Sequence, residues 1–111
     1  MVTYQDENGL GALNDGTRRA IVLSLAARPQ AVGELAAGLP VSRPAVSQHL
    51  KVLKEAGLVT EHAAGNRRIY QVNAAGLAAL RDQLDAFWNR AMAGYHNVVE
   101  QQVEHQEEEK S

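Results

Sequence analysis

The sequence predicts a mainly helical α+β domain with one small β-hairpin. Apolar residues recur at helical spacing in the stretch Ser42–Leu58, which reads SRPAVSQHLKVLKEAGL, and again from Asn73 to about Gln102. Between these stretches, LVTEHAA and RRIYQV have strand-like patterns, and the turn-forming Ala64-Gly65-Asn66 separates them. With 111 residues the chain has the length of one domain. We expect this domain to span residues 1–103 and an acidic, disordered tail to follow at 104–111.

The helix predicted in Ser42–Leu58 carries the most informative pattern. Ser42 is placed to cap its N-terminus, and Gly57 is placed to end it in a left-handed conformation. The apolar residues Val46, Leu50 and Leu53 form one narrow stripe. The remaining face is cationic or hydrogen-bonding and consists of Arg43, Ser47, Gln48, Lys51 and Lys54. A helix with such a face is suited to the major groove of DNA.

A second helix just upstream is needed to brace this one, and the sequence predicts it. After the break at Arg28-Pro29, a short helix covers about Val32 to Gly38, and the turn Gly38-Leu39-Pro40-Val41 leads into Ser42. Because Ala31 has no side-chain oxygen, we expect this short helix to be poorly capped. The order of helix, short glycine-containing turn and capped helix predicts a helix-turn-helix.

An earlier helix is predicted from the N-cap Asp15 to about Ala27, with its apolar residues facing inward at positions 21, 22 and 25. Thr17 and Arg18 fall on its first turn, where a docked phosphate would suit both the cation and the helix end. We therefore count them among the candidate DNA contacts, with ordinary solvated side chains as the alternative. A shorter helix around Leu10 and Leu13 precedes them.

The predicted β-hairpin follows the helix-turn-helix directly. Its tip carries Asn66, Arg67 and Arg68. A hairpin in this place forms the wing of a winged helix-turn-helix, and a basic tip can reach phosphates or the minor groove. The alternative is a solubilising hairpin whose charges protect its edges. Its position after a helix-turn-helix favours the DNA-binding interpretation.

The last helix predicts a homodimer. Its apolar residues recur at spacings of three and four, and the face that they form is too large for a small core to cover. These residues are Leu77, Leu80, Leu84, Phe87, Trp88, Ala91, Met92 and Tyr95. We expect this helix to pack on its counterpart in a two-fold dimer, together with Leu10 and Leu13 of the first helix. The alternative is that the whole apolar face folds back on its own domain.

Charge is distributed unevenly along the chain. The net charge is −2, yet residues 16–73 hold eight Lys and Arg against three Asp and Glu, a local balance of +5. Both ends are acidic, so only the middle of the chain is suited to a polyanion. The sequence has no cysteine, which excludes disulfides, thiolate metal sites and a catalytic thiol. No apolar run is long enough to span a bilayer and MVTYQDENG does not resemble a signal peptide, so we expect a cytoplasmic protein.

Taken together, these segments resemble the ArsR/SmtB family of bacterial winged-helix repressors. The matching segments are ALNDGTRRAIVLSL, VGELAAGLPVSRPAVSQHLKVLKEAGLV, EHAAGNRRIYQV and NAAGLAALRDQLDAFW. The resemblance implies a homodimeric repressor that binds an inverted repeat near a promoter, often its own. It also implies base and backbone contacts from the residues named above on the second helix of the motif and on the wing. His49 matches a histidine usual in this motif, where contact with a phosphate and a packing role are equal alternatives.

The chain departs from the family's metal-sensing members. Where those members carry cysteines, this sequence reads Glu34-Leu35-Ala36-Ala37, so that thiolate site is absent. On the last helix, His96 and Glu100 are four residues apart, but no second histidine pairs with them as family zinc sites require. We therefore expect no metal and no cofactor, and the sequence assigns no effector. A zinc-type repressor remains an alternative.

The sequence favours a double-stranded DNA-binding transcriptional regulator over the other classes. We find no Gly-rich phosphate loop, no nucleophile elbow and no closely spaced pair of inward carboxylates, so we do not expect an enzyme. A dimeric interaction module without DNA binding is a further alternative. It would require an acidic or apolar face at positions 43, 47 and 51, where this sequence is basic or polar.

Overall fold

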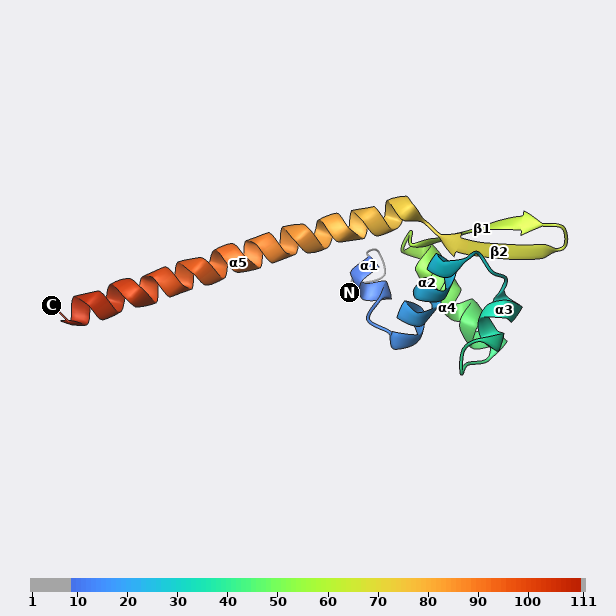
Figure 1. The fold of residues 1–111 in the computed structure, drawn as a ribbon, viewed down its shortest axis with the longest axis horizontal. Helices are drawn as coiled ribbons and strands as arrows, with labels where there is room; N and C mark the ends of the chain where they lie inside the picture. The colour runs from blue at the N-terminus through green and yellow to red at the C-terminus, as the bar shows by residue number, and fades with distance from the viewer. Residues whose placement is uncertain (1–8, 111) are drawn as a thin grey trace, which may run out of the picture. The chain divides into compact units, whose positions relative to one another are not determined.

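A computed structural model of the chain describes residues 9–110 and confirms the predicted fold class (Figure 1). Its elements follow in the order α1 (Gly9–Ala12), α2 (Gly16–Ala27), α3 (Val32–Ala37), α4 (Arg43–Glu55), β1 (Val59–Ala64), β2 (Arg67–Val72) and α5 (Ala74–Lys110). The chain divides into two compact units, the first ending at Leu80 and the second beginning at Arg81. α5 therefore contributes only its first turns to the first unit.

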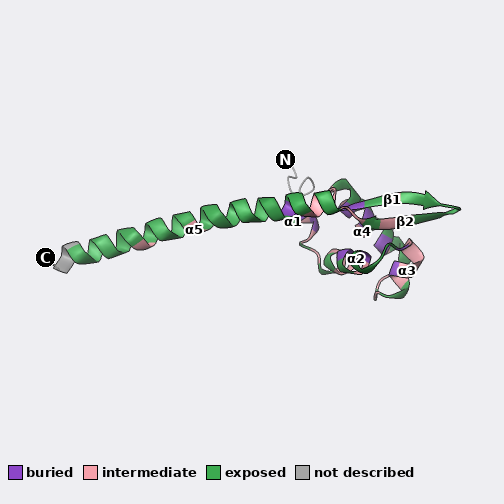
Figure 2. Ribbon diagram, turned by 45° about the horizontal axis from the view of Figure 1, so that its top comes forward, coloured by how far each residue is buried: buried purple, intermediate pink, exposed green. Residues whose placement is uncertain are grey.

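The hydrophobic core of the first unit is built from residues of nearly every element. α4 packs against α2 and α3, and α2 also contacts β2. Ile21, Leu35 and Leu50 are almost completely buried, one from each of these three helices. Figure 2 shows the buried positions in α2, α3 and α4 and the exposed positions that dominate α5 after its start. The inward-facing residues predicted for α2 and α4 are all buried, so both helical patterns are confirmed.

Side-chain caps begin the two longest helices of the first unit. Oδ1 of Asp15 accepts the backbone N–H of Arg18 at 3.0 Å, and Oγ of Ser42 accepts that of Ala45 at 3.2 Å. Each bond satisfies one of the N–H groups that a helix start leaves without an intrahelical partner. α4 is followed by Gly57, which has a φ of +80°. These features confirm the predicted starts of α2 and α4 and the predicted end of α4.

The start of α3 is better capped than the sequence suggests. Ala31 offers no side-chain oxygen, but Oε1 of Glu34 accepts the backbone N–H of Ala31 at 3.0 Å. This is the half of a capping box that a glutamate three residues into the helix supplies. The expectation of a poorly capped helix is therefore wrong in this respect.

The hairpin is a regular antiparallel pair in which Val59 lies opposite Val72 and Ala64 opposite Arg67. Its turn contains Gly65 at a φ of +66°, a conformation that glycine adopts without steric cost. β2 also pairs with the segment before α3, because Gln30 and Tyr70 exchange two backbone hydrogen bonds of 3.0 and 2.8 Å. The side chain of Gln30 is buried and donates to the carbonyl oxygen and hydroxyl of Ser24. The hairpin is therefore fixed to the helices at one defined register.

The first turn of α5 is anchored by a close backbone approach. The side-chain amide of Asn73 donates to the carbonyl oxygen of Gly57 at 2.9 Å. The backbone N–H of Asn73 donates to the carbonyl oxygen of Leu58 at 2.8 Å. A Cβ added to Gly76 would lie only 1.8 Å from the same Gly57 oxygen. Glycine is therefore required at position 76 for the helix to start where it does.

α5 is longer than predicted. We expected it to end near Gln102 and a disordered tail to begin at Glu104, whereas the helix continues to Lys110. The residues after Gln102 are mainly Glu, Gln and Lys, which are good helix formers, and no glycine or proline interrupts them. The domain division at residue 103 stays a prediction. Within the described residues, no helix is both long enough and apolar enough to cross a membrane.

Candidate nucleic-acid interface

α4 presents two faces of opposite character. Val46, Leu50 and Leu53 are buried and hold the helix against α2 and α3. Ser47, Gln48 and Lys51 are exposed on the other face. The inward positions fix the rotation of the helix about its axis, so the hydroxyl, amide and ammonium groups must point outward. Arg43 and Ser42, at the start of the helix, are exposed as well.

The ammonium group of Lys54, which the sequence predicts as a DNA contact, forms an ion pair within the chain. Its Nζ lies 2.6 Å from Oε1 of Glu61 on β1, in an ion pair whose carboxylate side chain is only 17% exposed. The pKa of Glu61 is lowered, first by the hydrogen bond from Lys54 and then by one from Tyr70. Lys54 therefore connects α4 to the hairpin, and its positive charge is largely compensated within the protein.

The first turn of α2 is tied to α1 and to α4. Nε of Arg18 donates to the carbonyl oxygen of Ala12, and its Nη1 lies 3.4 Å from Nδ1 of His49. Nη1 of Arg19 donates to the carbonyl oxygen of Leu13 at 2.7 Å. The structure thus brings Arg18 and His49 together, both half-buried, and gives the two arginines a role in holding α1. Thr17, also half-buried, precedes them, and contact of these residues with DNA stays a prediction.

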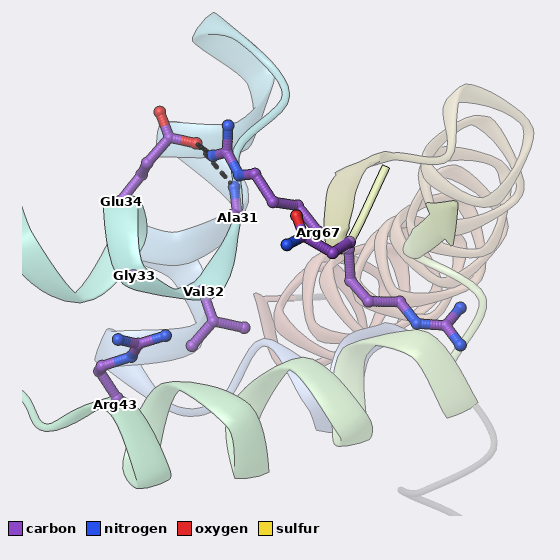
Figure 3. A pocket seen from close by; sticks show the side chains of 8 residues that line it. Ala31, Val32, Gly33, Glu34, Arg43 and Arg67 are labelled. Atoms are coloured by element: carbon purple, nitrogen blue, oxygen red, sulfur yellow. Dashed lines mark hydrogen bonds and ion pairs between the residues drawn. The ribbon is translucent and has the colours of Figure 1, made fainter. Parts of the chain in front are cut away.

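The hairpin tip is exposed at Asn66, Arg67 and Arg68, but Arg67 has a partner inside the chain. Its Nη2 lies 2.6 Å from Oε1 of Glu34 on α3. The other carboxylate oxygen of Glu34 lies 3.2 Å from Nη1 of Arg28. The pKa of Glu34 is lowered, first by the N–H of Ala31, then by the hydrogen bond from Arg28 and by the charge of Arg67. Figure 3 shows Arg67 reaching from the hairpin to Glu34.

Two grooves separate the hairpin from the helices. The larger has a volume of about 450 Å³ and is lined by Ala31, Val32, Gly33, Glu34, Arg43, Asn66, Arg67 and Arg68. We call it the arginine groove. The smaller, of about 210 Å³, is lined by Ser47, Leu50, Lys51, Lys54, Glu61 and Tyr70. Arg43 therefore shares one groove with the three residues of the hairpin tip, and Ser47, Lys51 and Lys54 line the other together with hairpin residues.

Three residues that organise this surface were missing from the predicted site: Gln30, Glu34 and Glu61. Each acts through a partner distant in sequence or through the backbone, so no local motif marks it. The spacing of Glu34 three residues after Ala31 was the one available signal, because it fits half of a capping box. The Glu34–Arg67 and Glu61–Lys54 ion pairs each join the hairpin to a helix.

The residues predicted for the dimer interface fall into two groups. Leu80 is buried in the core of its own chain, and Leu13 and Leu77 pack partly against that core. Because Leu80 is already covered, its apolar surface is not available to a partner. The other group is uncovered: Leu10, Leu84, Phe87, Trp88, Ala91 and Tyr95 are exposed, and Met92 is half-exposed. Leu23, which the prediction did not include, is also 72% exposed.

No group of three or more His, Asp or Glu residues close enough to hold a metal ion occurs in the part of the chain that the structure describes. Coordination of a structural metal usually takes four protein ligands. Among the described residues of one chain, the zinc-type alternative therefore has no supporting cluster.

Comparison with known proteins identifies the family. Residues 15–61 match the family described as "Bacterial regulatory protein, arsR family". Over 101 residues the chain is 60% identical to "HTH-type transcriptional regulator Rv2034" of Mycobacterium tuberculosis, which covers 90% of this chain and 94% of that protein. The chain belongs to the ArsR family. Like the other regulators of this family, it is a DNA-binding transcriptional regulator, and the named relatives give no indication of an enzyme.

More distant matches agree with the ArsR assignment. "Transcriptional repressor SdpR" of Bacillus subtilis is 33% identical over 66 residues, which cover 60% of this chain and 73% of that protein. A solved structure described as "Possible transcriptional regulator for arsenical resistance" superposes with a TM-score of 0.68 at 43% identity, covering 84% of this chain and 97% of that one. An "ArsR-like Transcriptional Regulator from Rhodococcus sp. RHA1" also has a TM-score of 0.68, at 31% identity over 86% and 92% of the two chains.

Proposed function

We propose that this ArsR-family chain is a repressor that binds an inverted-repeat operator as a homodimer. The observation that carries the proposal is the outward face of α4. Ser47, Gln48 and Lys51 are exposed there, while the opposite face is fixed in the core. Two relatives that match part of this chain are named repressors, which supports the direction of regulation.

In this proposal α4 lies in the major groove, where each base pair presents its own pattern of donors and acceptors. The amide of Gln48 can donate to and accept from one adenine edge, and Lys51 can donate to guanine acceptors. The exposed cations at the start of α4 and on the hairpin then contact phosphates, which supply much of the affinity but no sequence information. The local charge of +5 over residues 16–73 supports this division of roles.

The homodimer is supported by the apolar face of α5. Phe87, Trp88 and Tyr95 are 59%, 63% and 60% exposed, and Leu84 and Val98 lie on the same helix at 45% and 51%. Contiguous apolar surface of this kind marks an interaction site. An inverted repeat requires two copies of the DNA-binding unit related by a two-fold axis, and a symmetric dimer formed through α5 would supply them.

Footprinting of the protein on the DNA upstream of its own gene tests the proposal. We expect two protected half-sites whose centres lie about 10 base pairs, or a multiple of that, apart. Such a footprint would also support autoregulation. Protection of a single half-site, or uniform binding without a footprint at concentrations where the protein is dimeric, would refute the inverted-repeat proposal.

The zinc-type alternative is tested in the same assay. If the protein responds to zinc through His96 and its neighbours, adding the metal should change the operator affinity. The repressor proposed above does not depend on metal, so we expect the affinity to stay the same with zinc and with a chelator.

A further inference from the structure

One acidic residue of the helix-turn-helix, Glu34, lies at the tip of the wing. Gln30 and Tyr70 pair through their backbones in an antiparallel sense, so residues that follow Gln30 lie beside residues that precede Tyr70. α3 begins two residues after Gln30 and β2 begins three residues before Tyr70, so this backbone pairing holds the start of α3 near the start of β2. The side chains of Glu34 and Arg67 form a 2.6 Å ion pair there.

This ion pair is exposed, so it can exchange its partner. The side chains of Arg67 and Glu34 are 55% and 38% exposed. Exposed pairs of this kind contribute little net stability, because both groups are well solvated when they separate. Glu34 also keeps two other partners, the N–H of Ala31 and the guanidinium of Arg28, when Arg67 leaves. Arg67 is therefore the movable member of the pair.

A second guanidinium lies on the other side of the arginine groove without a carboxylate partner. Arg43 forms no ion pair with any residue that the structure describes. A Cβ added to Gly33 would lie 3.5 Å from its Cζ and Nη2, so the guanidinium rests against the backbone of α3 where no side chain intervenes. Figure 3 shows Arg43 rising from α4 beneath Gly33, with Glu34 and Arg67 farther along the same groove. Arginine side chains arranged in this way suit a phosphate, which accepts two parallel N–H bonds from one guanidinium.

We propose that the arginine groove binds one backbone phosphate of the operator between Arg43 and Arg67, and that Arg67 exchanges Glu34 for this phosphate when DNA binds. The inference rests on the DNA-binding function proposed above and adds a regulatory element to it. Glu34 holds the wing against α3 in the free protein and competes with the phosphate for the same guanidinium. It is a positioning residue, because it acts on DNA through Arg67.

The exchange makes Glu34 a limit on affinity that is independent of DNA sequence. Its carboxylate is charged at neutral pH, since its pKa is lowered. Every duplex, specific or not, must displace it, and weak non-specific binding thereby becomes weaker still. Removing the charge should therefore increase the affinity for operator and for unrelated DNA by the same factor.

The test measures binding of the full chain to two duplexes, the footprinted operator and an unrelated sequence of equal length, over a range of salt concentrations. Glu34→Gln keeps an acceptor for the N–H of Ala31 and removes the charge. We expect it to bind both duplexes about two- to fivefold more tightly than wild type, the range of an exposed ion pair. Asp82→Asn is the matched control, because it removes one negative charge from an exposed position on α5, and it should leave both affinities unchanged.

A double-mutant cycle isolates the role of Arg67. Arg67→Ala and Arg43→Gln should each reduce the slope of log affinity against log salt by about one unit. In the Arg67→Ala background, Glu34→Gln should no longer increase affinity, since the exchange has been removed. If the gain persists there, Glu34 merely repels DNA through space and the exchange is refuted. Thermal unfolding of each variant shows whether its fold is intact.

The outcomes separate this inference from the function on which it rests. If wild type binds neither duplex, both fail. If wild type binds the operator but Glu34→Gln and Arg67→Ala behave as wild type, only the phosphate groove fails. A last experiment uses inorganic pyrophosphate as a free ligand and measures the unfolding temperature of wild type and of Arg43→Gln. If pyrophosphate raises the unfolding temperature of wild type only, and the salt slopes for DNA binding are the same in the variants as in wild type, the groove binds a free phosphate compound. The assignment of the groove to DNA is then overturned.

Discussion

α4 and the outer part of α5 are both amphipathic helices, but the apolar face of α4 is buried within the chain and that of α5 is exposed. In α4 every residue of the apolar stripe is at most 1% exposed. In α5, every residue from Arg81 to Ala91 is exposed, including Phe87 and Trp88. The polar face of α4 is thus the part left for a partner, whereas in α5 it is the apolar face.

The difference indicates which partner each helix takes. A helix whose apolar residues are covered and whose outward groups are cations and amides offers hydrogen bonds and charge, which suit a polyanion. A helix that leaves aromatic side chains in water gains most by covering them with another apolar surface. We therefore propose that α4 binds DNA and that α5 binds protein, so substitutions on each helix should affect different measurements.

The largest effect should come from a charge on the apolar face of α5. Phe87→Glu should convert the dimer to a monomer and weaken operator binding by about 100-fold or more, because each half-site then binds without the avidity of its linked partner. Light scattering measures the mass and a gel-shift titration measures the affinity. A dimeric Phe87→Glu variant, or a monomeric wild type, would contradict the role given to this face.

Ala86→Glu is the matched control for that variant. It introduces the same charge one residue earlier, at an exposed position almost opposite to Leu84 around the helix. We expect it to remain dimeric and to bind the operator as wild type does. Loss of the dimer in both variants would mean that added charge alone, and not its position, separates the chains.

The two parts of α5 should also respond differently to the same substitution. Gly76→Ala places a Cβ 1.8 Å from the backbone oxygen of Gly57, a clash that only movement of the helix can relieve. We expect it to lower the free energy of unfolding by about 3 kcal/mol, the upper range for overpacking. Gly94 has no atom of the described chain within 4 Å of such a Cβ. There alanine should stabilise the helix by about 0.5–1 kcal/mol. Urea unfolding measures both, and equal effects would contradict the anchoring of α5 at Gly57.

The sequence predicted the elements of this comparison well because their signals are local. The cap at Ser42, the left-handed Gly57 and the turn at Gly65 are each set by one residue and its immediate neighbours, and all three are found in the structure. The apolar stripe of α4 is likewise decided by spacing alone. Fold class and the exposed candidate DNA contacts on α4 could therefore be read without coordinates.

What could not be predicted depends on contacts between distant parts of the chain. Arg67 and Glu34 are 33 residues apart in sequence, and they meet where the Gln30–Tyr70 pairing holds β2 beside the segment before α3. The burial of Leu80 could not be predicted without knowing how many turns of α5 pack against the core. The end of α5 was missed for a different reason, because an acidic composition is shared by disordered tails and by exposed helices.

A substitution on the exposed face of α4 tests base recognition. Gln48→Ala removes an amide that can contact a base edge, and we expect it to cost about 1–3 kcal/mol at the operator and to relax the preference for one base pair. Affinity for an unrelated duplex should stay the same, as should the dimer mass, which separates this variant from those on α5. If operator and unrelated DNA are affected equally, Gln48 contacts the backbone and not a base.

The smallest effect should come from the ion pair that joins α4 to the hairpin, and its size depends on pH. Because the pKa of Glu61 is lowered in the folded state, first by Lys54 and then by Tyr70, the pair stabilises the fold above the ordinary glutamate pKa of 4.5. This stabilisation is lost as the pH falls through the lowered pKa. Glu61→Gln should therefore be less stable than wild type by about 0.5–1 kcal/mol at neutral pH, a modest value because half of the Lys54 side chain is exposed. The two unfolding free energies should converge on acidification, and a difference that persists at low pH would show that packing of Glu61, and not its charge, holds the hairpin to α4.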